Sequence, residues 1–178
     1  ERERRSWGVS RMPGFLVTEA VRDPEVAKDL LGRAELRFAI WLAPTAVVLV
    51  DVTRAGLLQA EVFGHPPREV EERLAAYAGE PERTGLWIAE TADGQVVCSG
   101  RLDVVPGTEF AGLWGGGTHA DWRGRGIYRA LVAARARAAI GLGVVYLHSD
   151  CTPMSRPILE RSGLLPITTT TPYVWSRD

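Results

Sequence analysis

The stretch from Phe110 to Gly126, FAGLWGGGTHADWRGRG, combines residue types that can hold a phosphate group. Near its end, Arg123 and Arg125 alternate with Gly124 and Gly126. Arginine offers forked donors to phosphate oxygens, and glycine lets the backbone come close to a ligand. The pattern therefore predicts a site for a ligand that carries phosphate.

Two regular elements must position this turn. Residues 110–118 have the pattern of a strand that becomes glycine-rich at its end, and a helical pattern begins at Ile127. The first-turn amides of a helix lack internal partners, and the helix dipole adds positive charge there. A strand, a Gly/Arg turn and a helix therefore predict an anion site, with the amides of Arg125 to Tyr128 as the cradle. The alternative is a plain helix start with two surface arginines. The apolar residues at helical spacing are Ile127, Leu131, Ala134 and Ala138.

Composition limits the classes of function. The chain has 178 residues, 46% hydrophobic and 24% charged, with a formal net charge of −1. This is enough for one globular domain with a core, and the near-neutral charge argues against a nucleic-acid partner. No apolar run is long enough to span a membrane. Cys98 and Cys151 lack metal-type spacing, so we expect idle thiols in a reducing, cytoplasmic compartment and no metal.

The first 45 residues are interpreted separately from the rest. Residues 1–14 are charged and then turn-like, and Phe15 to Glu19 has the pattern of a short strand. Asp23 and Pro24 indicate a helix start, and we expect that helix to run to about Trp41. We therefore predict an N-terminal arm and extra helical element over residues 1–45, used for packing or as a homodimer surface, and a main domain over residues 46–178.

The main domain is expected to alternate strands and helices. Asp93 and Gly94 lie between two apolar runs, which is a strong hairpin signal. The last helix is expected to be capped by Thr152 or Ser155. The predicted elements are a strand over Ala46–Val52, helices over Arg54–Phe63 and Arg68–Tyr77, strands over Trp87–Glu90, Val96–Val105 and Phe110–Thr118, a helix from Ile127, a strand over Val144–Ser149, a helix over Pro153–Ser162 and a strand over Leu164–Trp175.

Two motifs and the order of elements resemble the GNAT superfamily of N-acetyltransferases. The run from Arg123 to Tyr128 resembles the family's Arg/Gln-x-x-Gly-x-Gly/Ala loop, and Thr152 to Leu164 resembles its Asn-x-x-Ala-x-x-Leu-Tyr-Glu-Lys-x-Gly-Phe segment. The order over residues 46–175 is similar to the family fold. The resemblance implies an α/β (α+β) domain whose central sheet is mixed, mostly antiparallel, and flanked by helices. It also implies transfer of the acetyl group of acetyl-coenzyme A to a primary amine of a small acceptor.

The resemblance also implies which residues hold the coenzyme. The loop amides would hold the pyrophosphate, and the strand end would pair with the pantetheine arm. A backbone donor near Thr118 would stabilise the oxyanion. The residues implied in coenzyme binding are Gly116, Gly117, Thr118, Arg123, Gly124, Arg125, Gly126, Ile127, Tyr128, Thr152 and Ser155.

Four positions depart from the family pattern. Tyr128 replaces a Gly or Ala, Thr152 replaces an Asn, and Leu159 replaces a Tyr proposed as general acid. The fourth is Gly112, which stands where many members have, on this strand, a Glu that acts as the general base. A bacterial subgroup resembles this chain in its Gly-Gly-Gly-Thr and Arg-Gly-Arg-Gly-Ile-Tyr runs, which would make Tyr128 and Leu159 subgroup features. The other candidates for the acid are Tyr128, Tyr146 and Tyr173, with ring packing as the alternative role for each.

The general base has two carboxylate candidates, Glu109 before the glycine-rich strand end and Asp150 after the next strand. The alternative role of Glu109 is a solvated surface charge, and that of Asp150 is a helix cap. His119, His148 and Glu61 are further candidates with structural alternatives. Two rival functions remain open. One is a non-catalytic acyl-coenzyme A-binding or regulatory module. The other, a nucleotide-binding protein, is disfavoured because the chain has no Gly-Lys-Ser/Thr loop.

Overall fold

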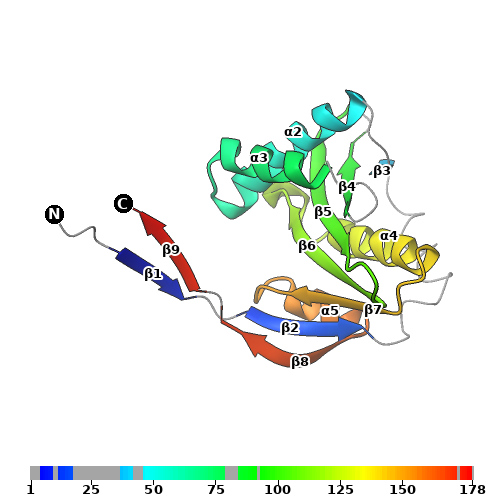
Figure 1. The fold of residues 1–178 in the computed structure, drawn as a ribbon. Helices are drawn as coiled ribbons and strands as arrows, with labels where there is room; N and C mark the ends of the chain where they lie inside the picture. The colour runs from blue at the N-terminus through cyan, green and yellow to red at the C-terminus, as the bar shows by residue number, and fades with distance from the viewer. Residues whose placement is uncertain are drawn as a thin grey trace.

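The computed structural model describes residues 5–9, 12–17, 37–41, 46–78, 84–91, 93–171 and 173–177. Figure 1 shows the strands and helices of this part of the chain. Their order is β1 (Arg5–Val9), β2 (Met12–Val17), β3 (Arg37–Trp41), α2 (Ala46–Phe63), α3 (Pro67–Ala78), β4 (Thr84–Glu90), β5 (Val96–Val104), β6 (Phe110–Thr118), a 3-10 turn (Ala120–Trp122), α4 (Ile127–Gly141), β7 (Tyr146–Asp150), α5 (Arg156–Arg161), β8 (Leu164–Thr170) and β9 (Tyr173–Arg177).

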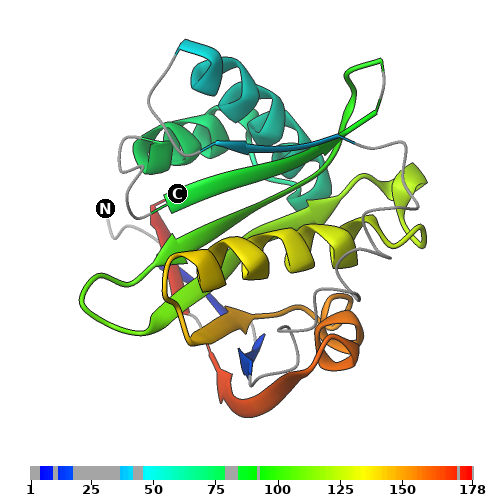
Figure 2. The ribbon, with the colours of Figure 1, turned by 90° about the vertical axis from the view of Figure 1, so that its right-hand side faces the viewer.

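A seven-stranded sheet forms the centre of the molecule, in the order β3-β4-β5-β6-β7-β2-β8. Among the described strands, only the β6–β7 pair is parallel, and the other neighbours in this sheet are antiparallel. Helices α2 and α3 cover one face and α4 covers the other, as Figure 2 shows from the side. This arrangement confirms the prediction of a mixed, mostly antiparallel sheet flanked by helices.

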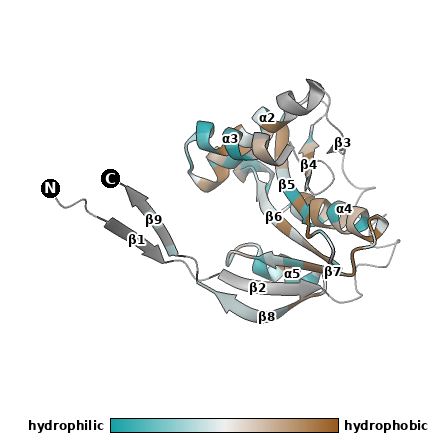
Figure 3. Ribbon diagram, in the orientation of Figure 1, coloured by the Kyte–Doolittle hydropathy of each residue, from teal (hydrophilic) through white to brown (hydrophobic). Residues whose placement is uncertain are grey.

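The core has one part on each face of the sheet. On one side, α4 packs Leu131, Ala136 and Ala139 against the strands, and the small alanines let the helix approach closely. On the other side, Val52 and Ala55 of α2 form a second cluster. Helices α3 and α4 each carry both hydrophobic and hydrophilic residues, as Figure 3 shows and as helices with one face on a sheet require. Among the described residues, no helix is long and apolar enough to cross a membrane.

The predicted strand over Ala46–Val52 is wrong, because these residues form the first turns of α2. A short apolar run does not by itself distinguish a strand from a buried helix segment. Here the run continues at helical spacing, and Val52, Ala55 and Leu58 are all buried. Packing on the sheet therefore overrides the strand preference of the valines. Thr53, which precedes the predicted helix over Arg54–Phe63, also lies inside α2.

The predicted helix ending near Trp41 is wrong at its C-terminal end. Arg37–Trp41 is the edge strand β3, paired with β4 from Arg37↔Glu90 to Trp41↔Leu86. The aromatic and β-branched residues of RFAIW suit a strand once a partner edge is available. The start of that predicted helix lies outside the described residues.

The expected short strand over Phe15 to Glu19 is confirmed as far as Val17. The strand, β2, already begins at Met12, in the stretch predicted to be turn-like, and it runs between β7 and β8. Strands from both sides of the expected boundary at residue 45 therefore share one sheet. Outside this sheet, β1 and β9 pair with each other as a separate two-stranded ribbon. This ribbon extends away from the body and carries both chain ends (Figure 1).

The α4 face of the core yields a stability prediction. Leu131 is fully buried beneath the sheet, whereas Leu142 at the end of the same helix is 52% exposed. Replacing Leu131 with Ala should lower the free energy of unfolding by about 2–5 kcal/mol, because the apolar burial is lost and a cavity remains. Leu142→Ala is the matched control and should change it by less than about 0.5 kcal/mol. Urea denaturation measures both, and equal losses would contradict this assignment of the core.

Candidate functional site

Strands β6 and β7 begin as neighbours and then separate. Their parallel pairing runs from Phe110↔Tyr146 to Gly112↔His148 and goes no further. One residue further along each strand, the Ser149 hydroxyl donates to the carbonyl of Leu113 at 3.0 Å. Strand β6 continues to pair with β5 as far as Cys98↔Thr118. The last residues of β6 therefore have β5 on one side and no strand partner from β7 on the other.

A bulge in β6 lies where the strands separate. Trp114 pairs with Arg101 and Gly117 pairs with Ser99, so Gly115 and Gly116 together oppose a single residue of β5. Gly115 has a φ of +58°, which glycine adopts without the strain that a side chain would add. The bulge turns the strand end away from β7 and opens the edge.

Gln59 of α2 contacts this bulge from the face of the sheet that α2 covers, opposite to α4. The side chain is buried, and its Nε2 donates to the carbonyl of Gly115 at 3.1 Å and to the hydroxyl of Ser99 at 3.3 Å. One amide group thus ties β5 to the bulged residue of β6. The position of the open strand edge depends on this contact.

The turn after β6 brings the start of α4 to the same place. Gly126 is the N-cap of α4 with a φ of +79° and contributes no side-chain cap. The first-turn amides of α4 therefore face outward without a capping side chain. Arg123 turns back and donates from Nε to the carbonyl of Thr118 at 3.1 Å, which fixes the strand end against the turn.

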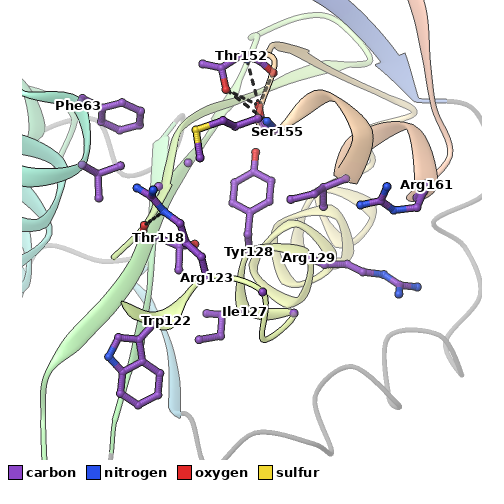
Figure 4. A pocket seen from close by; sticks show the side chains of 17 residues that line it. Phe63, Thr118, Trp122, Arg123, Ile127, Tyr128, Arg129, Thr152, Ser155 and Arg161 are labelled. Carbon is purple, nitrogen blue, oxygen red and sulfur yellow. Dashed lines mark hydrogen bonds between the residues drawn. The ribbon is translucent and has the colours of Figure 1, made fainter. Parts of the chain in front are cut away.

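These elements enclose one side of a cavity of about 650 Å³. The other walls come from the end of α2, the segment after β7 and helix α5 (Figure 4). The charged side chains among the described lining residues are all arginines: Arg123, Arg129 and Arg161. The remaining lining residues are Val62, Phe63, Gly116, Gly117, Thr118, Trp122, Gly124, Gly126, Ile127, Tyr128, Thr152, Met154, Ser155 and Ile158.

The predicted coenzyme residues come together in this cavity, with one exception. All of them line it except Arg125. The guanidinium of Arg125 lies 4.6 Å from the centroid of the Trp122 ring and donates to the carbonyl of Asp121 at 3.2 Å. Thr152 and Ser155 lie opposite the turn, with their hydroxyl oxygens 3.2 Å apart. Two segments far apart in sequence therefore face each other across one space.

The two predicted base candidates do not line the cavity. Glu109 is exposed just before β6 begins, at the end of the strand opposite Thr118. Its carbonyl accepts hydrogen bonds from the amides of Val145 and Tyr146. Asp150 is the last residue of β7 and pairs with Gly14 of β2.

The histidine candidates have structural partners. The Nδ1 of His119 accepts from the amide of Asp121 at 3.2 Å, and its Nε2 lies 3.1 Å from a carboxylate oxygen of Glu61. Both ring nitrogens are therefore engaged. His148 packs edge-on against Trp114, with ring centroids 5.5 Å apart. Among the described residues, no group of acidic, His and Cys side chains is arranged to hold a metal.

The tyrosine candidates separate clearly. Tyr146 stacks on Phe110 at a centroid distance of 5.0 Å, and Tyr173 lies on the protruding strand β9. Tyr128 alone among these three lines the cavity. Leu159, at the position where the resemblance expects a tyrosine, is fully buried in the core.

Two buried polar residues behind the site, Gln59 and Arg135, were not predicted from the sequence. Gln59 had no role assigned, although a polar residue on the buried face of a helix is a usable signal. Arg135 is 1% exposed on α4 and donates from Nη1 to the carbonyl of Arg101 at 2.9 Å. A cation within the apolar sequence of α4 is the corresponding signal, since buried charges are almost always paired.

The contact of Gln59 with the bulge yields a second prediction. In Gln59→Leu the carbonyl of Gly115 loses its side-chain donor, so the free energy of unfolding should fall by about 1–3 kcal/mol. Gln95→Leu makes the same change at an exposed turn position and should be close to neutral. Urea denaturation compares the two variants. A Gln59→Leu protein as stable as the wild type would show that the bulge does not need this contact.

Solved structures with the same fold include proteins described as acetyltransferases. A glucosamine N-acetyltransferase region of a fungal multi-domain GH3 β-N-acetylglucosaminidase has a TM-score of 0.70 at 15% identity, over 96% of this chain and 21% of that one. A GCN5-related N-acetyltransferase from Kribbella flavida has a TM-score of 0.63 at 16% identity, over 95% of this chain and 59% of that one. AAC(6')-Iy in complex with the bisubstrate analogue CoA-S-monomethyl-acetylneamine has a TM-score of 0.59 at 19% identity, over 73% of this chain and 90% of that one.

The present chain spans about a fifth of the fungal protein and about three fifths of the Kribbella protein. At these identities the likeness shows a shared fold. A comparison with curated protein sequences found no match. The family model described as the acetyltransferase (GNAT) family matches residues 52–161, which is more than half of the chain and includes β6, the turn, α4 and α5. The chain therefore belongs to the GNAT family of acetyltransferases.

Proposed function

We propose that this protein is an N-acetyltransferase that moves the acetyl group of acetyl-coenzyme A to a primary amine by direct attack. One observation carries the proposal: the open end of β6 and the uncapped start of α4 face the same cavity. A strand edge that lacks a partner and a helix start that lacks a capping side chain offer backbone donors side by side. Such a pair suits a ligand with an amide-bearing arm and a diphosphate.

The charges of the cavity fit a phosphorylated coenzyme. Three arginines line it, and none of the described lining residues is acidic. The start of α4 adds the positive end of the helix dipole. Gly126 leaves open space, because a Cβ there would meet no atom within 4 Å. We assign the diphosphate to the first-turn amides of α4, with Arg123 and Arg129 nearby. The cavity volume also lies in the range of ligand pockets, about 300–1,000 Å³.

The strand end would hold the rest of the coenzyme. Gly116, Gly117 and Thr118 lie where β6 has no partner from β7, so the pantetheine amides can continue the sheet there. The amine nitrogen then attacks the thioester carbonyl carbon. A backbone amide near Thr118 is assigned to the oxyanion that forms. The carbon–sulfur bond breaks as the new amide bond is completed.

Asp150 or a water molecule is assigned to accept the proton of the amine. Asp150 lies at the end of β7, two residues before Thr152, which lines the cavity. Glu109 lies at the other end of β6, nine residues before Thr118, which is roughly 30 Å along a strand. Of the two carboxylates, Asp150 is therefore the better placed to act through a water molecule.

The acceptor is assigned as a small amine. The structural neighbours include a protein described as a glucosamine N-acetyltransferase and one bound to an acetylneamine conjugate. These descriptions make amino sugars the first acceptors to test. Phe63, Met154 and Ile158 give the cavity an apolar wall, so arylalkylamines form a second group.

Substitution of Gly126 tests the coenzyme cradle. Gly126→Val places a branched side chain at the start of α4, where it would block the approach of a phosphate to the amides. Gly143→Val is the matched control: its φ is +78° against +79°, it has the same open space, and it lies just after the other end of α4. Calorimetric titration with coenzyme A should show binding to the wild type and Gly143→Val, and a loss of at least about 100-fold, or about 2.7 kcal/mol, for Gly126→Val. Equal affinity in both variants would contradict the cradle.

Turnover separates this function from the rival non-catalytic binder. Wild-type protein is incubated with acetyl-coenzyme A and amines of both groups, and release of coenzyme A is measured together with the acetylated amine. Product formation supports the proposal. Binding of acetyl-coenzyme A without product from any amine, or with hydrolysis alone, would favour the acyl-coenzyme A-binding module.

A further inference from the structure

The side chain of Tyr128 stands inside the cavity and divides it into two parts. Tyr128 is the second residue of α4 and lines the cavity. Figure 4 shows its ring between Thr118 on one side and Arg129 and Arg161 on the other. The hydroxyl points toward Ser155. The open end of β6 therefore lies on one side of the ring, and two of the three lining arginines lie on the other.

The ring contacts both sides of the opening between β6 and β7. A Cβ placed on Gly116 would lie 2.7 Å from Cε2 of Tyr128 and 3.2 Å from its hydroxyl oxygen, so the ring rests on the backbone of β6. On the other side, the hydroxyl makes a side-chain hydrogen bond with Ser155, which follows β7. Burial raises the pKa of Tyr128, so the phenol keeps its proton for this bond at neutral pH. The ring thus bridges the two segments that separate where the β6–β7 pairing ends.

This bridge occupies space that the coenzyme arm needs. The diphosphate is assigned to the start of α4, near Arg129, and the arm is assigned to the open edge of β6 from Gly116 to Thr118. A segment that pairs with a strand lies about 4.8 Å from it. At Gly116 the Tyr128 ring already lies within this distance of the β6 backbone. The arm and the bridging ring therefore exclude each other at this residue.

The contact that holds the ring in this place is easily replaced. When the ring leaves, Oγ of Ser155 still accepts from the amide of Thr152 at 3.1 Å, and the two hydroxyl oxygens remain 3.2 Å apart. The phenol hydroxyl exchanges its partner for water. Departure of the ring therefore leaves neither hydroxyl without a hydrogen-bond partner, which is the expensive outcome for a polar group.

We propose that the Tyr128 side chain is a gate, which closes the opening between β6 and the segment after β7 in the free protein and turns out of it before the coenzyme arm pairs with β6. The inference rests on the function proposed above and adds a conformational step to it. The diphosphate site is accessible in both positions of the ring, because it uses backbone amides of α4. A ligand that ends at the diphosphate therefore binds without this step, whereas the complete coenzyme requires it.

Fluorine NMR can observe the movement of the ring. The chain has four tyrosines, so incorporation of fluorotyrosine gives one signal for each, and Tyr128→Phe identifies that of Tyr128. On binding of coenzyme A, this signal should gain the solvent isotope shift of an exposed ring between H2O and D2O. With 3′-phosphoadenosine 5′-diphosphate, the fragment of coenzyme A that ends at the diphosphate, it should stay as in the free protein. Tyr146 stacks on Phe110 outside the cavity and is the internal control. A Tyr128 signal without this gain in the coenzyme A complex would overturn the proposal.

Association rates, followed by tryptophan fluorescence in a stopped-flow instrument, test the cost of opening the gate. Tyr128→Ala removes the ring and should bind coenzyme A at least about tenfold faster than the wild type, because a minor open state is populated to roughly 10% or less. The fragment should associate equally fast with both proteins. Tyr128→Phe keeps the ring and loses the bond to Ser155, so it should gain about two- to tenfold, and it replaces the alanine variant if that one does not fold. Tyr146→Phe should match the wild type.

The results that contradict the gate differ from those that contradict the proposed function. Equal association of coenzyme A with the wild type and both Tyr128 variants, or weaker binding by Tyr128→Ala, would show that the ring is a fixed wall of the site and would overturn the gate. Coenzyme A still binds to the wild type in those cases. Failure of coenzyme A to bind to the wild type and to the Tyr128 variants would instead refute the proposed function itself.

Discussion

The end of the β6–β7 pairing at Gly112 and His148 is the constraint on which the rest of this structure depends. A parallel pair that continued to Thr118 would close the sheet and bury the strand end. Because the strands separate, the backbone of β6 is open at the point where the turn and α4 begin. A ligand can then use strand amides and helix amides at the same time. The cavity, its arginines and the position of Tyr128 all follow from this separation.

An open strand end needs support from buried polar groups on both faces of the sheet. Gln59 reaches it from α2, Arg135 reaches the neighbouring carbonyls from α4, and Ser149 bridges the last step before the strands part. Each of these side chains is at most 7% exposed. A buried polar residue is stabilising only when its partners are in place, so these contacts favour one arrangement of the bulge. These contacts therefore fix the strand end to which the coenzyme is assigned.

Much of the candidate site was predictable from sequence because its signals are local. Glycines and a strict helical period mark the limits of Phe110–Thr118 and the start of α4, and both limits are confirmed. Arg125 is the exception among the predicted coenzyme residues. The structure gives its guanidinium a ring contact with Trp122, which a loop pattern does not encode. Ala46–Val52 and Arg37–Trp41 were misassigned because their state depends on distant partners: a sheet face for the first and the edge of β4 for the second. Gln59 and Arg135 were missed for the same reason, since only the folded sheet brings the bulge to them.

Thermal unfolding with acetyl-coenzyme A, coenzyme A, ATP and NAD tests whether the end of β6 and the start of α4 bind one ligand together. A ligand present at 100 times its dissociation constant stabilises the folded state by about 2.7 kcal/mol, which is several degrees for a domain of this size. We expect such a shift with both coenzyme A compounds and a much smaller one with ATP and NAD, which lack an arm that can pair with the end of β6. No shift with either coenzyme A compound, or an equal shift with ATP or NAD, would contradict it.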